Sequence, residues 1–297
     1  MLLISAFKKY FALDPKQKEF IRSSQRIFLC QPEELLKFLR PLANFDKDCD
    51  GARRQCGYMM IASFIIGIIS MILIGNELVP AAIGTTLLFL MIAWFFVSLI
   101  LYFILGRIDI HNNLREFVVP LVNAIGQDMK ENEKMKLKID LRGKCIPSKQ
   151  IKKDGSNPGW FSYPKVTRTF FRDPWLDGSA VLCDGSKMFF SVTDMIVQTK
   201  RTKKNPRGKI KTKTKVKIKS KIRVGLALKN KTYQIDANDR LRESGDRVKQ
   251  KQNDKRNIFS LTRIEHSTDI DKALDPVSML AMIGKIFMSV RPAAKKG

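Results

Sequence analysis

The sequence predicts an α+β membrane protein, in which a two-helix transmembrane hairpin precedes a β-rich, basic domain with flanking helices. Three observations predict this fold class. Residues Tyr58–Leu105 form a block of 48 residues with a single charge, Glu77. Basic residues alternate without interruption with uncharged ones from Lys209 to Val224. The chain of 297 residues has 54 Lys and Arg against 28 Asp and Glu, a formal charge of +26, which argues against a simple soluble enzyme and a polytopic transporter.

Residues 1–57 are predicted to be a cytoplasmic, helical N-terminal segment. Pro32–Phe45 has the period of an amphipathic helix, with leucines 35, 36, 39 and 42 on one side. A second helix, around Phe7–Phe20, would pack on the C-terminal domain or lie along the membrane surface. The first residues lack the long apolar run of a secretory signal.

The apolar block, residues 58–105, is predicted to be the transmembrane hairpin, with helices over 58–74 and 80–105. At about 1.5 Å per residue these helices reach roughly 26 and 39 Å, and a bilayer core is about 30 Å thick. Arg53 and Arg54 precede the first helix and Arg107 follows the second, whereas the turn has no Lys or Arg. The positive-inside rule therefore predicts an integral protein of the inner or plasma membrane with both termini in the cytoplasm.

Small residues lie at packing positions in the two spans: Ser63, Gly67 and Ser70 in the first, and Gly84 in the second. Such residues let helix backbones approach closely. They either pack the hairpin against itself or support a homo- or hetero-oligomer. Neither span carries an ionisable residue at mid-membrane, which argues against a pump or secondary transporter but leaves a pore formed by oligomerisation open.

Residues 106–297 are predicted to form the basic, β-rich cytoplasmic domain. A helix over 110–129 would lead into it, and a helix over 276–290 would close it, with Asp275 as the N-cap. Between them, residues 135–142 alternate in polarity, and Asp184-Gly185 lies between two apolar runs as in a β-hairpin. The last helix is apolar nearly all round, so it should be buried, face another subunit or lie next to the membrane.

The strongest candidate for a binding surface is a lysine ladder on one strand. Its cations occupy the odd positions: Lys209, Lys211, Lys213, Lys215, Lys217, Lys219, Lys221 and Arg223. A period of two places these side chains on one face of a strand roughly 50 Å long. If Asn205–Gly208 is a four-residue loop, Lys204 faces Lys209 and Lys200 joins the cationic face opposite Lys213.

Two interpretations of the ladder follow. The lysines could be a solvated face that protects a strand against aggregation. Alternatively, with Lys200, they bind an acidic partner protein, the anionic lipid of the bilayer, or a nucleotide or nucleic acid. The ladder contains no aromatic residue on which bases could stack, so sequence-specific nucleic-acid binding is poorly supported.

No catalytic motif, cofactor-binding motif or metal-ligand cluster is present in the sequence, so neither a cofactor nor a metal is expected. The two histidines, His111 and His266, are expected at a surface or interface. Asp173 and Asp194 recur with other aspartates near Pro or Gly, where turn formation would explain them. The five cysteines are scattered, which favours a reducing compartment.

The expected function is that of a membrane-anchored scaffold or assembly subunit, whose basic cytoplasmic domain docks an acidic partner or the anionic leaflet. The alternative is a membrane sensor–effector that binds a nucleotide or nucleic acid and oligomerises through its hairpin. Aromatic residues lining a concave basic pocket would favour this alternative. A membrane-tethered enzyme would require a pocket with convergent acidic residues.

Overall fold

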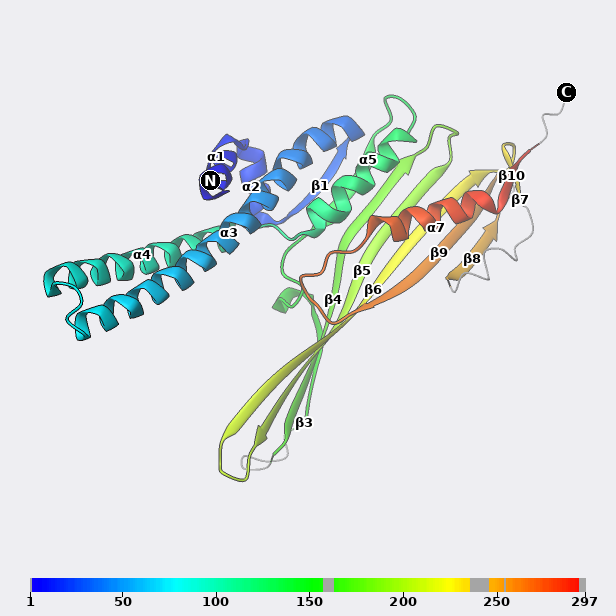
Figure 1. The fold of residues 1–297 in the computed structure, drawn as a ribbon. Helices are drawn as coiled ribbons and strands as arrows, with labels where there is room; N and C mark the ends of the chain where they lie inside the picture. Colours follow the sequence, from blue (N-terminus) through cyan, green and yellow to red (C-terminus); the bar gives the residue numbers. More distant parts are fainter. Residues whose placement is uncertain (1, 157–162, 236–245, 254, 294–297) are drawn as a thin grey trace. The chain divides into compact units, whose positions relative to one another are not determined.

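The computed structural model describes residues 2–156, 163–235, 246–253 and 255–293, and the parts of the predicted 106–297 domain between these ranges lie outside the described residues (Figure 1). The chain is α+β and forms two compact units. The first comprises residues 2–22 and 38–110, and the second comprises residues 23–37 and 111–293. The second unit is therefore assembled from segments on both sides of the apolar block.

The first unit is helical. It contains α1 (Leu2–Ala12), α2 (Pro15–Ser23, except its last residue), most of α3 (Pro32–Gly75) and α4 (Ala81–Ile108). Each of α3 and α4 contains a stretch long and apolar enough to cross a membrane. The separate helices expected over 32–45 and 58–74 are one continuous helix, which includes Pro41, and α4 continues three residues beyond the expected end at Leu105.

Polar and aromatic contacts hold the first unit together next to its apolar hairpin. The rings of Tyr10 and Phe45 lie 5.6 Å apart, and Lys9 Nζ lies 2.8 Å from Asp48 Oδ2, so α1 packs on α3. Arg53 of α3 pairs with Asp109 just after α4. The turn between the helices closes with Glu77 at a φ of 57°.

The second unit is built on an antiparallel sheet. Its main strands follow the order β1-β2-β4-β5-β6-β9-β8, and β3 pairs with the outer half of β4. The strands of this sheet are β1 (Gln25–Cys30), β2 (Met135–Asp140), β3 (Gln150–Ser156), β4 (Lys165–Val181), β5 (Lys187–Lys204), β6 (Ile210–Lys229), β8 (Arg247–Gln252) and β9 (Arg256–Ser267). A separate two-stranded pair joins β7 (Tyr233–Ile235) to β10 (Val290–Pro292).

Helices cover one face of this sheet. Figure 1 shows α5 (Val119–Gln127) and α7 (Pro276–Met288) lying over the same side. Beneath them the inward positions are buried and apolar, including Phe190 on β5, Leu226 on β6 and Phe259 on β9. Phe117 lies in the short π-helix Leu114–Val118 (η1) and packs edge-on against Trp175, with the ring centroids 5.4 Å apart. The opposite positions of the same strands form an open face, defined here by Ser191 and Thr193 of β5 and their register partners.

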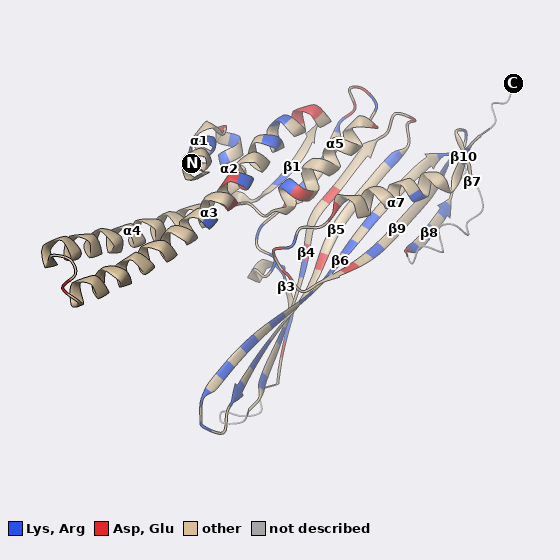
Figure 2. Cartoon of the chain, in the orientation of Figure 1, with Lys and Arg blue, Asp and Glu red and all other residues tan. Residues whose placement is uncertain are grey.

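Part of the sheet extends beyond this core as a strand bundle, named here the cationic arm. It comprises β3 and residues 165–170 of β4, 197–204 of β5 and 210–217 of β6, with the connecting turn 205–209. At its base, Phe171, Ile196 and Ile218 form a small buried cluster. Beyond that cluster both faces of β6 are exposed, from Ile210 to Lys215. Figure 2 shows Lys and Arg along the arm strands.

Several local expectations differ from the structure. The segment 1–57 is not wholly helical, because β1 lies within it and pairs with β2. The helix expected over 110–129 is η1 followed by α5, and the last helix ends at Met288 rather than at residue 290. That helix buries Met279, Met282 and Ile286 and leaves Val277 and Met288 exposed, so it is amphipathic in its packing.

Candidate functional site

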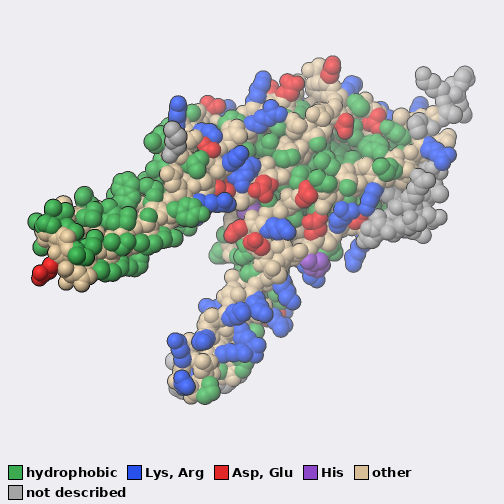
Figure 3. All heavy atoms as spheres, in the orientation of Figure 1, with side chains coloured by type: hydrophobic (Ala, Val, Ile, Leu, Met, Phe, Trp, Pro, Cys, Tyr) green, Lys and Arg blue, Asp and Glu red, His purple; other side chains and the backbone are tan. Residues whose placement is uncertain are grey.

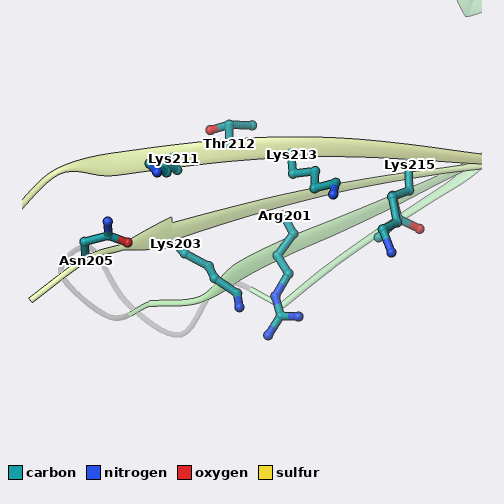
Figure 4. Close-up of a pocket in the computed structure, with 8 residues that line it drawn as sticks. Arg201, Lys203, Asn205, Lys211, Thr212, Lys213 and Lys215 are labelled. Atoms are coloured by element: carbon teal, nitrogen blue, oxygen red, sulfur yellow. The ribbon is translucent and has the colours of Figure 1, made fainter.

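The candidate site is a groove on the outer part of the β5–β6 hairpin. It encloses about 710 Å³, and the described residues of its lining include five cations and no acidic side chain. Figure 4 shows the side chains of Arg201, Lys203 and Lys215 extending to the same side of the hairpin, with Thr212 on the other. The lining residues are Thr199, Arg201, Lys203, Asn205, Lys211, Thr212, Lys213 and Lys215.

The register of the hairpin differs by one residue from the expected one. Lys204 pairs with Ile210 rather than Lys209, because the loop has five residues, Asn205–Lys209, and not four. Asn205 N donates to Lys209 O across it, and Gly208 has a φ of 79°. A one-residue shift changes which side chains share a face. As a result, Lys200 lies opposite Thr214, on the face of the hairpin away from the ladder. Arg201 and Lys203 lie on the ladder face instead.

This register brings like charges together directly. Lys203 is the partner of Lys211, and Arg201 is the partner of Lys213. Directly opposed residues have Cβ atoms about 4.5–5.5 Å apart, and like charges there are destabilising. Successive cations along one strand lie about 7 Å apart, where two charges in water repel by about 0.6 kcal/mol before screening by salt. The groove therefore concentrates a positive potential that a bound anion would relieve.

The remaining ladder residues continue the same face toward the body of the sheet. Lys217, Lys219, Lys221 and Arg223 follow at alternate positions and are exposed, whereas Lys209 lies in the connecting loop. The even face is packed only from Ile218 inward, so the expected apolar face exists only near the body. Farther out, Thr202 and Thr212 hydroxyls meet at 3.0 Å on that face.

The four small residues singled out in the spans lie between α3 and α4. A Cβ added to Gly84 would approach Ile74 Cγ1 to 2.3 Å, and one added to Gly67 would lie 3.8 Å from Leu88 Cδ1. Ser63 and Ser70 are buried and donate to Met60 O and Ile66 O of their own helix. These contacts are within one chain, and self-association stays a prediction.

A second cluster of charges, buried beneath the sheet, was not expected. Asp173 on β4 and Asp194 on β5 are direct partners within the strands, not turn residues. Lys149 Nζ lies 2.7 Å from Asp173 Oδ1, and Lys144 Nζ lies 3.5 Å from Asp194 Oδ2. Lys149 also lies 3.3 Å from Asp140 Oδ1. The sequence signal was Asp194 itself, which occupies an inward position between Val192 and Ile196.

Burial dominates the electrostatics of this cluster. It raises the pKa of Asp173 to about 6, although Lys149 acts in the opposite direction. His111 is largely buried as well. This burial is the main cause of its lowered pKa, and the positive charge of Lys144 lowers the pKa further. Asp173 and Asp194 are each only about 1% exposed, so they are closed to a substrate, and they lie at the base of the arm.

Within the described parts of the chain, no three His, Cys, Asp or Glu side chains are grouped to hold a metal ion. Comparisons with protein-family models, with curated proteins and with solved structures find no match to this chain.

Proposed function

We propose that this protein is a membrane-anchored docking subunit, in which the α3–α4 hairpin crosses the bilayer and the cationic arm binds an anionic surface. The observation that carries the proposal is the groove of five cations without an acidic neighbour in its lining. None of the described residues that line this groove is aromatic, which favours docking over the nucleotide-binding alternative.

The exposure of the hairpin supports the membrane anchor. Figure 3 shows apolar side chains over most of the visible surface of the outer part of the α3–α4 hairpin. Phe64 and Phe89 are 63% and 71% exposed, and many other large apolar side chains of residues 58–105 are exposed as well. Soluble proteins rarely expose apolar surface on this scale, whereas a bilayer accepts it.

The sheet supports a two-span topology. β1 precedes the hairpin in the chain and β2 follows it, yet the two strands are hydrogen-bonded neighbours from Gln25–Asp140 to Cys30–Met135. A hairpin that crosses the bilayer twice returns the chain to the side on which it started. Arg53, Arg54 and Arg107 flank the spans, so the positive-inside rule assigns this side to the cytoplasm.

An anionic leaflet fits the arm better than an acidic protein does. Protein interfaces concentrate their binding energy in buried aromatic and apolar anchors, and the groove lining has none among the residues that the structure describes. A lipid surface requires only charge, and each Lys or Arg near it contributes about 1 kcal/mol. The membrane tether adds a high effective concentration.

The test uses the full chain in neutral nanodiscs, mixed with vesicles of neutral lipid with or without one quarter phosphatidylglycerol. Reversing Lys213, Lys215 and Lys217 to Glu should weaken the free energy of vesicle binding by at least about 3 kcal/mol, which is more than 100-fold in affinity. High salt should also weaken the binding of the unchanged chain. The matched control reverses Lys136, Lys249 and Lys251, which lie on the sheet outside the arm. Unchanged binding of the arm variant would contradict the proposal, and loss of a co-purifying acidic protein alone would favour the protein partner.

A further inference from the structure

A second cavity lies on the open face of the sheet, closer to its centre than the cationic groove. It encloses about 300 Å³, at the lower end of the range of about 300–1,000 Å³ found for small-ligand sites. Its lining comes from three adjacent strands: Arg172 of β4, Ser191, Thr193 and Met195 of β5, and Lys221 and Arg223 of β6.

The register explains why the surface is hollow here. Ser191 is the partner of Arg223, and Thr193 is the partner of Lys221, so short hydroxyl side chains lie beside long cationic ones. β4 has a bulge at this point, because its pairing passes from Asp173–Asp194 directly to Leu176–Val192. The large side chain of the bulge, Trp175, is buried on the helix-covered side and does not fill the space.

The cations of this cavity have no acidic partner in the part of the chain that the structure describes. None of Arg172, Lys221 and Arg223 forms an ion pair with any residue in the described ranges. The nearest acid in register on this face is Asp177, opposite Ser191, and it does not line the cavity. Lys138 of β2 lies opposite Asp177 on its other side.

These groups match the chemistry of a terminal phosphate. A phosphate monoester carries about −1.5 to −2 charges and three strong acceptor oxygens. Guanidinium groups bind such oxygens through paired N–H donors, and hydroxyl groups supply further donors. The described lining residues include no aromatic side chain for a base, and their cations exceed the charge of a single carboxylate.

We infer that the cavity formed by Arg172, Ser191, Thr193, Lys221 and Arg223 binds the phosphate group of a monoester lipid headgroup or of free phosphate. This site is separate from the arm. The arm attracts anions by charge alone, whereas the cavity combines charge with two hydroxyl donors and selects a monoester over a diester.

The experiment is calorimetry on the full chain in detergent micelles at fixed ionic strength. The probes are inorganic phosphate, dihexanoyl phosphatidic acid as a lipid monoester, and dihexanoyl phosphatidylglycerol as the diester. We expect phosphate or the lipid monoester to bind at least about tenfold more tightly than the diester, because charged hydrogen bonds are lost with the third terminal oxygen. Tighter binding of phosphatidic acid identifies a lipid source, and tighter binding of inorganic phosphate identifies a soluble one.

The variants separate the cavity from general charge. Arg172→Gln with Arg223→Gln should weaken binding at least about tenfold, and Thr193→Val, which keeps the charge, about threefold or more. Lys249→Gln with Lys251→Gln makes the same charge change elsewhere on the sheet and should alter binding less than twofold. The Glu variants of Lys213, Lys215 and Lys217 should also retain phosphate binding, so failure of the arm proposal would not affect this one. Equal loss in the cavity and control variants, or no preference for a monoester, would overturn the inference.

Discussion

Asp173 and Asp194 lie directly opposite each other on β4 and β5, and a different lysine neutralises each buried carboxylate. Two like charges in this position would destabilise the sheet without those lysines. The pair lies two residues inward from Phe171 and Ile196, at the base of the cationic arm. The buried ion pairs therefore lie where the covered part of the sheet ends and the arm begins.

Replacing Lys149 by Met should strongly destabilise the second unit, because it leaves Asp173 and Asp140 without their shared cation. Removing one partner of a buried ion pair costs about 3–5 kcal/mol. Lys152→Met is the control, since Lys152 is 67% exposed in its pair with Asp154 and should cost at most about 1 kcal/mol. Urea unfolding of the full chain in detergent measures both, and equal midpoints would show that the buried pair is unimportant.

Asp246→Asn should destabilise the protein in a pH-dependent manner. Asp246 accepts two hydrogen bonds from Arg263 and lies 3.2 Å from Lys285 of α7, and the hydrogen bond from Arg263 is the main cause of its lowered pKa. A carboxyl group with a lowered pKa stabilises the folded state above its unfolded pKa, near 4, and this contribution disappears as the pH falls through the folded pKa.

The variant should therefore lose about 1–3 kcal/mol at pH 7, and the difference from the native chain should shrink as the pH falls below the unfolded pKa, near 4. Unfolding midpoints at pH 7, 5 and 3 test this dependence. A difference that stays constant with pH would assign the effect to packing rather than to the charge.

Gly178→Ala should destabilise the sheet, whereas Gly155→Ala should not. A Cβ on Gly178 would lie 2.3 Å from Cζ of Phe190, its cross-strand partner, whose ring is buried in the core. Overpacking of this kind costs about 1–3 kcal/mol. At Gly155 the nearest atom lies 4.0 Å away, so the change should stay within about 0.5 kcal/mol. Thermal unfolding of the two variants gives the comparison, and a tolerant Gly178 would mean that Phe190 can move.

Labelling with a membrane-impermeant maleimide should place Asn76 outside the cytoplasm. In intact cells, Asn76→Cys in the hairpin turn should react from outside, since both spans must cross to bring it there. Cys183, an exposed native thiol of the second unit, should react only after permeabilisation. Reaction of both sites only after permeabilisation would contradict the topology.

Local signals determined which parts of the structure could be predicted. The two apolar helices follow from length and composition, and the strands β5 and β6 follow from a period of two over a long segment. The predicted hairpin register was wrong because the sequence does not show whether Lys209 pairs with a residue of β5 or belongs to the turn. The alternation also could not show where burial of the even face of β6 ends, since the exposed Thr212 and Thr214 occupy the same alternate positions as the buried Ile218 and Ile222.

Contacts distant in sequence were beyond prediction. β1 was missed because its six residues lie between two helices and its partner follows the whole apolar block. Lys144 lies in irregular chain and Lys149 lies in a single helical turn, so no periodicity in the sequence shows that they point inward. The cavity of Arg172 and Arg223 likewise depends on the order of three strands and on the bulge in β4.

The pairing of β1 with β2 constrains the order of events during synthesis. Cys30 leaves the ribosome about 105 residues before Met135, its partner. Until then the backbone of β1 lacks its hydrogen-bonding partner, and Phe28, which is buried in the finished sheet, is uncovered. The hairpin is thus synthesised before the sheet can be completed, and β1 stays without its partner strand throughout that interval.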